Sequence, residues 1–350
     1  MILVVVEHEA GRVERTSLEA VTIGRKLAAG LGVPLHAAAF GLGAGVGAGT
    51  AGAGEVMASL ATHGVESVHA IDHPGLTDYA PAAWGVALGQ LVAALAPTAV
   101  LAAATDRGSE VMAHLAARTG QALAANCIEV RPGAEPAAAT AMGATWEVTR
   151  QRWGGSLLED AAIVGAPRLL TVAPHAIAAA EAPVAGGATP VAGGAALEPF
   201  EPLLSERDLA VRVVRRLATE EGRVSLADAR VVVGGGRGVG SSEGFAVLDE
   251  LAGLLGGTVG VSRAVTSAGW RPHAQQVGQT GTRIAPELYI ACGISGAIQH
   301  MVGARTAKRI LAINTDPNAP MVVQATYAVV GDLRTILPAI VAEIRRPSGA

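Results

Sequence analysis

Aromatic side chains and cysteine are scarce in this sequence. Only 3% of the 350 residues are aromatic, whereas 50% are hydrophobic, so a buried core has to be built mainly from aliphatic side chains. The two cysteines, Cys127 and Cys292, are far apart and lie in no metal-ligand spacing, which argues against a disulfide framework and against a zinc site. We interpret each as a small buried hydrophobic residue in a reducing compartment.

The sequence also lacks a strong excess of charge of either sign. The formal net charge is -4, no long block of either sign occurs, and no basic patch of the kind that nucleic-acid-binding proteins carry is present. The first residues run directly into a strand pattern, without a secretory signal or an arginine-rich transit segment. The sequence therefore disfavours a nucleic-acid partner. The abundance of alanine and glycine favours a bacterial protein in the cytoplasm, and a location in the mitochondrial matrix is the alternative.

One stretch resembles a membrane span, because no charged side chain occurs between Asp78 and Asp106. Gln90 and Pro97 interrupt it. The pattern predicts a buried helix that ends before Pro97, followed by a buried strand over residues 99–103. We therefore expect no direct membrane insertion.

Short apolar runs alternate with helix-length segments along the first half of the chain. Strands are expected at residues 2–6, 35–40, 68–72, 100–104, 128–131, 144–151 and 169–172, and helices at 17–31, 55–63, 82–96 and 110–119. Continuous apolar strands separated by helices predict a parallel sheet that is covered on both faces.

The segment 176–200, rich in alanine, glycine and proline, breaks this pattern and is interpreted as an extended connection. A second α/β unit follows, with strands expected at 230–233, 288–291 and 309–313 and helices at 242–255, from 296, and at 333–344. The prediction is two α/β domains, 1–200 and 201–350. Each has a mainly parallel sheet with helices on both faces, and the second is Rossmann-like.

Two patterns in the first half have competing interpretations. Gly47, Gly49 and Gly52 form a G-x-G-x-x-G match, with Asp72 further on, as in nicotinamide-dependent dehydrogenases. The match lies within a run of glycine and alanine, so a surface loop is the alternative. His69, Asp72 and His73 have metal-ligand chemistry, but exposed polar residues are ordinary at the end of a strand.

Three glycine-containing loops lie in the second half, and the first and the third follow predicted strands. They are residues 234–240 (GGGRGVG), 277–281 (VGQTG) and 294–300 (ISGAIQH). Glycine lets the backbone approach a phosphate, a helix start supplies free N–H groups, and Arg237 adds a full positive charge. Loops at the carboxyl ends of parallel strands converge on one crevice. Together they favour a large phosphate-bearing ligand over three independent tight turns.

Several segments of this half resemble the signature of electron-transfer flavoprotein α subunits. The resemblance rests mainly on residues 286–291 (PELYIA), 293–300 (GISGAIQH) and 313–314 (IN). Four further segments match the same family in the same order: 234–238, 262–263, 276–281 and 331–333. Residues 4–8 and 104–108 carry a weaker match. The chain departs from the family at Thr282, Thr326, Ala173 and residues 152–156, changes that leave the expected cofactor site intact.

The resemblance implies that residues 201–350 bind FAD. It places the isoalloxazine ring near Arg263 and His300, the pyrophosphate near Arg237, and the adenosine half near Asn314. The complete set of cofactor-binding residues that it implies is Arg237, Ser262, Arg263, Gln276, Val277, Gly278, Gln279, Thr280, Ser295, Gly296, Ala297, Ile298, Gln299, His300, Asn314, Asp332 and Leu333. No catalytic side chain and no metal ligand is expected, because the flavin carries the redox chemistry.

The resemblance also implies a function. The chain is expected to be a redox carrier rather than an enzyme with its own substrate, and to form a heterodimer with an electron-transfer flavoprotein β subunit. It would accept electrons from flavin dehydrogenases, such as the acyl-CoA dehydrogenases of fatty acid β-oxidation, and pass them to a membrane quinone oxidoreductase. The alternatives are an electron-bifurcating complex that uses NADH, a nicotinamide-dependent dehydrogenase, and a scaffold whose flavin site has lapsed.

Overall fold

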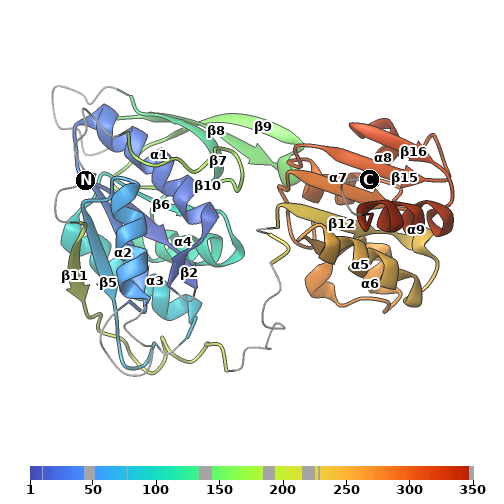
Figure 1. Ribbon diagram of the computed structural model, residues 1–350. Helices are drawn as coiled ribbons and strands as arrows, with labels where there is room; N and C mark the ends of the chain where they lie inside the picture. The colour runs from blue at the N-terminus through green and yellow to red at the C-terminus, as the bar shows by residue number, and fades with distance from the viewer. Residues whose placement is uncertain are drawn as a thin grey trace. The chain divides into compact units, whose positions relative to one another are not determined.

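The computed structural model describes residues 1–9, 11–42, 52–76, 78–133, 144–183, 194–214, 225–227 and 229–346. Contacts within the chain divide it into two compact units, Met1–Arg216 and Leu217–Ala350 (Figure 1). We call them unit 1 and unit 2. The boundary predicted at residue 200 precedes this division, because the residues that follow still bond to unit 1: the Leu203 N–H donates to Gln90 Oε1 at 2.9 Å, and the Val213 N–H donates to Tyr79 O at 2.9 Å.

Unit 1 contains a nine-stranded sheet, as far as its residues are described, in the order β11-β5-β4-β1-β6-β10-β7-β8-β9. Its strands are β1 (Ile2–Val6), β4 (Leu35–Phe40), β5 (Ser67–Ile71), β6 (Ala99–Ala103), β7 (Leu123–Arg131), β8 (Trp146–Arg152), β9 (Leu157–Ile163), β10 (Arg168–Val172) and β11 (Ala196–Phe200). The strands from β11 to β7 run parallel. A short hairpin, β2 (His8–Glu9) and β3 (Arg12–Val13), lies outside this sheet.

Helices cover both faces of this sheet, as the continuous apolar strands predict. They are α1 (Arg15–Leu31), α2 (Ala53–Thr62), α3 (Pro81–Leu95) and α4 (Asp106–Thr119). The buried side chains of α1 and α2 belong to one hydrophobic cluster, and those of α3 and α4 to another on the opposite face. Strands β1 and β6 are buried along their whole length, so their alternate side chains supply both clusters.

The antiparallel hairpin β8–β9 is a feature that the sequence predicted only in part. Residues 144–151 were expected as a strand, whereas β9 was not, because its exposed charged residues obscure its apolar ones. Cross-strand polar pairs fix the register instead: Arg150 Nε lies 2.8 Å from Glu159 Oε2, and Thr149 Oγ1 donates to Asp160 Oδ1 at 2.6 Å.

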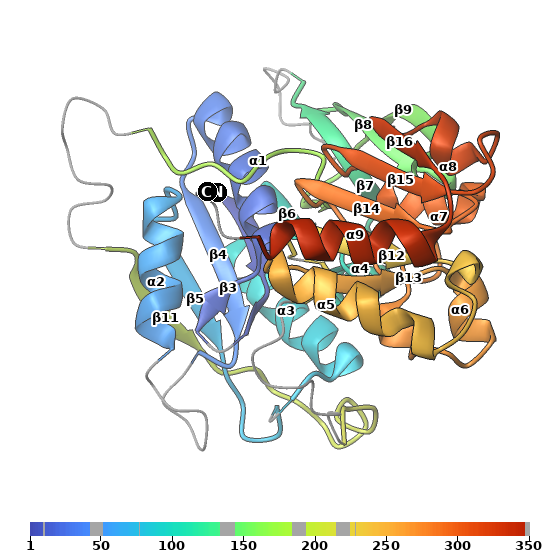
Figure 2. The same cartoon turned by 45° about the vertical axis from the view of Figure 1, so that its right-hand side comes forward.

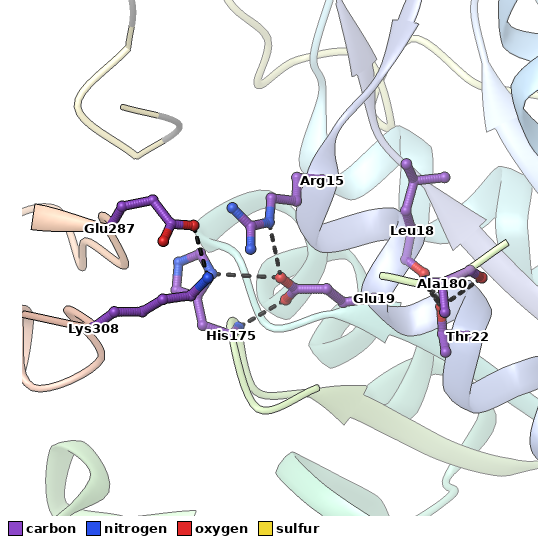
Figure 3. A network of polar contacts seen from close by, with 8 residues as sticks. All are labelled: Arg15, Leu18, Glu19, Thr22, His175, Ala180, Glu287 and Lys308. Atoms are coloured by element: carbon purple, nitrogen blue, oxygen red, sulfur yellow. Dashed lines mark hydrogen bonds and ion pairs between the residues drawn. The ribbon is translucent and has the colours of Figure 1, made fainter. Parts of the chain in front are cut away.

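The chain after β10 is held against α1 by hydrogen bonds, which Figure 3 shows from close by. The His175 backbone N–H donates to Glu19 Oε2 at 2.7 Å, and the Ala180 N–H donates to Thr22 Oγ1 at 3.1 Å. Arg15 Nε lies 3.5 Å from Glu19 Oε1 on the same helix. The first part of the predicted connection is therefore extended but anchored, and its last part forms β11, which pairs with β5.

Unit 2 contains an all-parallel sheet of five strands in its described residues, in the order β13-β12-β14-β15-β16 (Figure 2). They are β12 (Val231–Gly235), β13 (Thr258–Val261), β14 (Leu288–Cys292), β15 (Ile310–Asn314) and β16 (Tyr327–Val330). The sequence patterns did not predict β13 and β16. The first is only four residues long and contains Gly260, and the second is exposed along its whole length.

Helices again lie on both faces: α5 (Ala246–Leu254), α6 (Arg263–Ser267), α7 (Ile298–Ala304), α8 (Pro320–Val323) and α9 (Leu333–Ile344). Helices α5 and α9 lie side by side on one face in both overall views. Met301 of α7 and Met321 of α8 belong to the hydrophobic cluster on the other face. The predicted Rossmann-like arrangement of unit 2 is confirmed.

The stretch that resembles a membrane span is an ordinary part of unit 1. Helix α3 ends at Leu95, before Pro97, and strand β6 begins at Ala99, as the sequence predicted. Among the helices of the described residues, none has the length and apolar character needed to cross a bilayer.

Candidate functional site

The main pocket of unit 2 lies at the carboxyl ends of its central strands. Strand β12 is followed along the chain by β13 on one side of it, whereas β14, β15 and β16 lie on the other side. Strand order reverses between β12 and β14, and ligands of open α/β sheets bind at such switch points. The cavity there has a volume of about 350 Å³, within the range of cofactor sites.

Most of the predicted cofactor-binding residues line this pocket. They are Arg237, Ser262, Arg263, Gln276, Val277, Gly278, Gln279, Thr280, Ser295, Ala297, Gln299 and His300. Three further lining residues, Ala264, Gly293 and Ile294, were not among the predicted residues. Each directly adjoins a predicted motif residue or lies within a quoted motif, so the sequence already contained the signal for them.

The first and third loops touch through their backbones, and glycine makes this contact possible. A Cβ atom on Gly236 would lie 2.2 Å from the Gly293 carbonyl oxygen, and one on Gly238 would lie 2.7 Å from Gly293 Cα. The Gly236 N–H donates to Cys292 O at 2.9 Å, and the Gly238 N–H donates to Gly293 O at 3.1 Å. Gly293 itself has a φ of +61°, which favours glycine. The floor of the pocket is therefore built from close-packed backbone.

The second loop is fixed by hydrogen bonds to its neighbours. The Gln279 N–H donates to Gln299 O at 2.8 Å, which ties the loop to α7. The buried amide of Gln276 accepts from Thr266 Oγ1 at 2.6 Å and donates to Thr280 Oγ1 at 3.0 Å. The side chains that this loop presents to the pocket are thus held by contacts that exist without a ligand.

Two guanidinium groups give the pocket a positive charge. Arg237 follows β12, and Arg263 begins α6, directly after the N-cap residue Ser262. Both side chains are exposed, and neither has a carboxylate partner among the residues that the structure describes. A phosphate or pyrophosphate would satisfy these cations, which have five N–H donors each in a fork that matches such groups.

His300 brings an uncharged imidazole to the same pocket. Its Nε2 lies 2.8 Å from Tyr289 Oη, and its Nδ1 has no partner that meets hydrogen-bond geometry in the described chain. Burial lowers the pKa of His300 to about 4, although the backbone of Val277 opposes the shift in part. At neutral pH the ring is therefore neutral.

The remaining predicted residues lie close to the pocket without lining it. Gly296 packs against the start of α8, where a Cβ would lie 2.3 Å from Met321 N. Asn314 Nδ2 donates to Ile294 O at 3.1 Å, Asp332 accepts from the Arg334 N–H as the N-cap of α9, and Leu333 is buried in the core. Ile298 begins α7 and is 71% exposed. Their predicted roles in binding the cofactor stay predictions.

The alternative sites of the first half gain no support. Gly47 and Gly49 lie outside the described residues. His69 Nε2 lies 3.0 Å from His36 Nδ1, and His73 Nδ1 accepts from the Gly75 N–H. In the described chain, no three histidine, cysteine, aspartate or glutamate side chains are grouped so that they could hold a metal ion. Cys127 and Cys292 are buried, and burial raises the pKa of both thiols to about 12.

These features fit a dinucleotide. Glycine lets the loops of the pocket pack closely through their backbones, and Arg237 and Arg263 line it without a carboxylate partner in the described part of the chain, as a site for phosphate requires. The fold and the site thus fit a dinucleotide-binding α/β protein, with the switch-point pocket of unit 2 as the candidate cofactor site.

Comparison with known protein families identifies the cofactor. Residues 225–305 match the electron transfer flavoprotein FAD-binding domain, and residues 2–196 match the electron transfer flavoprotein domain. The electron transfer flavoprotein subunit alpha of Mycobacterium leprae is 35% identical over 349 residues, which cover 99% of each chain. Protein FixB of Clostridium saccharobutylicum is 34% identical over 345 residues, 98% of this chain and 96% of the relative.

The chain belongs to the electron transfer flavoprotein α-subunit family, and FAD is its cofactor. Protein FixB of Rhizobium meliloti, 35% identical over 97% of this chain and 91% of its own length, is a further relative. The family matches cover the two units separately, in agreement with the two α/β folds. The resemblance drawn from the sequence motifs is therefore confirmed.

Proposed function

We propose that this chain is the FAD-holding subunit of a heterodimeric electron carrier in the bacterial cytoplasm. It accepts electrons from flavin dehydrogenases, such as the acyl-CoA dehydrogenases of fatty acid β-oxidation, and passes them to a membrane quinone oxidoreductase. The observation that carries the proposal is the switch-point pocket of unit 2, where two guanidinium groups without a carboxylate partner in the described residues lie beside the glycine-containing loops of the FAD-binding family.

The bound flavin supplies the electron transfer chemistry, and the protein holds it and sets its surroundings. Arg237 contributes positive charge for the pyrophosphate. Arg263 contributes a fixed cation beside the redox-active ring, which favours uptake of negative charge there. Gln279 and Thr280 offer polar contacts from a loop that is already ordered, and His300 stays neutral. No side chain has to remove a proton from a substrate in this proposal.

A second subunit is part of the proposal because one side of the pocket is open. The lining residues Arg263, Gln279, Thr280, Ser295 and Gln299 are all exposed. The chain is strongly apolar, with a mean hydropathy of +0.40. An obligate subunit interface resembles a hydrophobic core and would bury part of this apolar surface. The partner that fits is the β subunit of the same family, packed over the exposed flavin.

Coexpression tests this proposal. The chain alone should self-associate, aggregate or lose FAD during gel filtration, whereas coexpression with its cognate β subunit should yield a one-to-one complex that retains FAD. Light scattering and the ratio of flavin to protein absorbance give the two measurements. A monodisperse monomer, saturated with FAD and passing electrons alone, would overturn the heterodimer.

The same preparation separates the donors. One FAD in this chain, reduced by an acyl-CoA dehydrogenase with its substrate and reoxidised by a quinone oxidoreductase, supports the proposed path. A second FAD in the partner together with reduction by NADH would replace it with the bifurcating alternative. Reduction by NADH without any flavin would instead support a nicotinamide-dependent dehydrogenase.

A further inference from the structure

A buried glycine near the end of α7 makes room for backbone rather than for a side chain. In β12, Gly234 makes room for Tyr289 of the neighbouring β14: a Cβ there would lie 2.3 Å from the tyrosine Oη and 2.5 Å from its ring. A Cβ at Gly303 would instead lie 2.3 Å from Gly278 N and 2.4 Å from Gly278 Cα. Gly278 lines the pocket as part of the second loop, whereas Gly303 does not line it. Gly303 can therefore act on the pocket only through this loop.

The second loop and the residues after it run along α7. The Gln279 N–H donates to Gln299 O at the start of the helix, and the Ile284 N–H donates to Gly303 O, each at 2.8 Å. Just after the helix, Thr306 Oγ1 donates to Ile284 O at 2.7 Å. These bonds hold the loop against α7 on both sides of the point where the two backbones meet.

Neither partner of this close contact can move aside easily. The loop is closed by its own hydrogen bonds, because the Thr282 N–H donates to Gln276 O at 2.7 Å and the Gly278 N–H donates to Thr282 O at 3.2 Å. Helix α7 is fixed in the hydrophobic cluster by Met301 and Ala304, which are 6% and 0% exposed. Ordinary van der Waals contact begins at 3.4 Å. An added methyl group would therefore displace the loop as a body, by roughly 1 Å.

We propose that Gly303 is a positioning residue of the cofactor site, which sets the distance between the second loop and α7. Gln279 and Thr280 line the pocket from the loop, and Gln299 and His300 line it from the helix. The spacing of the two elements therefore decides whether groups from both can contact one bound flavin. Such groups have to be held within about 0.5 Å of their productive positions. The inference rests on the proposed function, which places the flavin in this pocket.

Gly303→Ala in the coexpressed, FAD-loaded complex tests the proposal. The methyl group should push the loop away from α7, and the FAD dissociation constant should rise about 5- to 50-fold, as expected for the loss of one or two hydrogen bonds. The first reduction potential should fall as well, because polar groups of the loop stabilise the more negative, reduced ring more than the oxidised ring. FAD titration of the deflavinated complex and spectroelectrochemistry of the loaded complex give the two measurements.

Gly253→Ala is the matched control. Gly253 is the second-to-last residue of α5, as Gly303 is of α7, and a Cβ there would meet no atom within 4 Å. This variant should keep the wild-type FAD affinity and potential. A folded Gly303→Ala complex with wild-type affinity and potential would overturn the inference even if its urea midpoint were lower, because the glycine would then serve packing alone.

Thr306→Val tests the same spacing if Gly303→Ala does not fold. It removes the hydroxyl that donates to Ile284 O and adds no atom at the close contact, so the loop is held less firmly against the helix. The FAD dissociation constant should rise about two- to fivefold, and an unchanged value would overturn the inference. FAD missing from the wild-type complex would instead count against the proposed function.

Discussion

The contact between Gly238 and Gly293 makes a quantitative prediction about Gly293→Ala. The substitution forces an alanine to adopt a φ of +61° and places its Cβ 2.7 Å from Gly238 Cα. Backbone strain at such a position costs about 1–3 kcal/mol. The collision involves backbone rather than a flexible side chain, and overpacking of this kind adds about 1–3 kcal/mol.

Gly256→Ala provides a control that separates these two terms. Gly256 has a φ of +62°, close to that of Gly293, but a Cβ there would meet no atom within 4 Å. It should therefore show the backbone term alone, and Gly293→Ala should be less stable than Gly256→Ala by about 1–3 kcal/mol. Urea unfolding of the purified holoprotein, followed by far-ultraviolet circular dichroism, measures the difference.

FAD affinity gives an independent readout of the same contact. Gly293 lines the pocket, whereas Gly256 does not. If the strain falls on the bound conformation, 1–3 kcal/mol corresponds to an increase of about 5- to 150-fold in the FAD dissociation constant of Gly293→Ala. Gly256→Ala should stay near the wild-type value. Equal stability and equal FAD affinity for the two variants would refute the close approach of the two loops as a determinant of the site.

Three further predictions address charge, pH and the third loop. Arg263→Ala should lower the first reduction potential of the bound flavin, measured by spectroelectrochemistry, because a nearby cation is worth about 1–4 kcal/mol, or on the order of 40–170 mV for one electron; Arg263→Lys should lower it less. The folded-state pKa of His300 is about 4 against an ordinary value of 6.5, so the unfolded chain takes up the proton first as the pH falls from 6.5 to 4. The wild type should lose up to about 3 kcal/mol of stability over that range, and His300→Gln less, in urea midpoints at pH 7 and pH 4.5. Ser295→Ala combined with Gly296→Val should reduce the FAD content, since a Cβ at position 296 collides with Met321 N and the φ there is +81°; a normal yellow holoprotein would contradict this.

Local patterns in the sequence predicted the buried elements well and the exposed ones poorly. The bounds of helix α3 and strand β6 were predicted to within a residue or two, because a continuous apolar run that a proline interrupts is compatible with few other structures. Strands β9, β11 and β16 were not predicted. They lie at sheet edges or are largely exposed, so pairing with a neighbouring strand stabilises them rather than their own apolar pattern.

The candidate site was predictable from the sequence where its residues lie in continuous motifs. Arg237, Gln279 and Ser295 could be grouped in advance, since loops at the carboxyl ends of parallel strands converge. The hydrogen bond between Tyr289 and His300 was not predictable, because a buried tyrosine in a strand looks like any core residue. Contacts between side chains on different elements depend on packing, which no local pattern records.

The narrow space at Gly234 has an evolutionary consequence. The phenol of Tyr289 occupies the volume that a side chain at position 234 would need, although the two positions are far apart in the sequence. Within this family, they should therefore vary as a pair: a larger residue at position 234 should occur only together with a smaller one at position 289. Such sequences would also lack the phenolic hydroxyl, so Nε2 of the pocket histidine would need another hydrogen-bond partner.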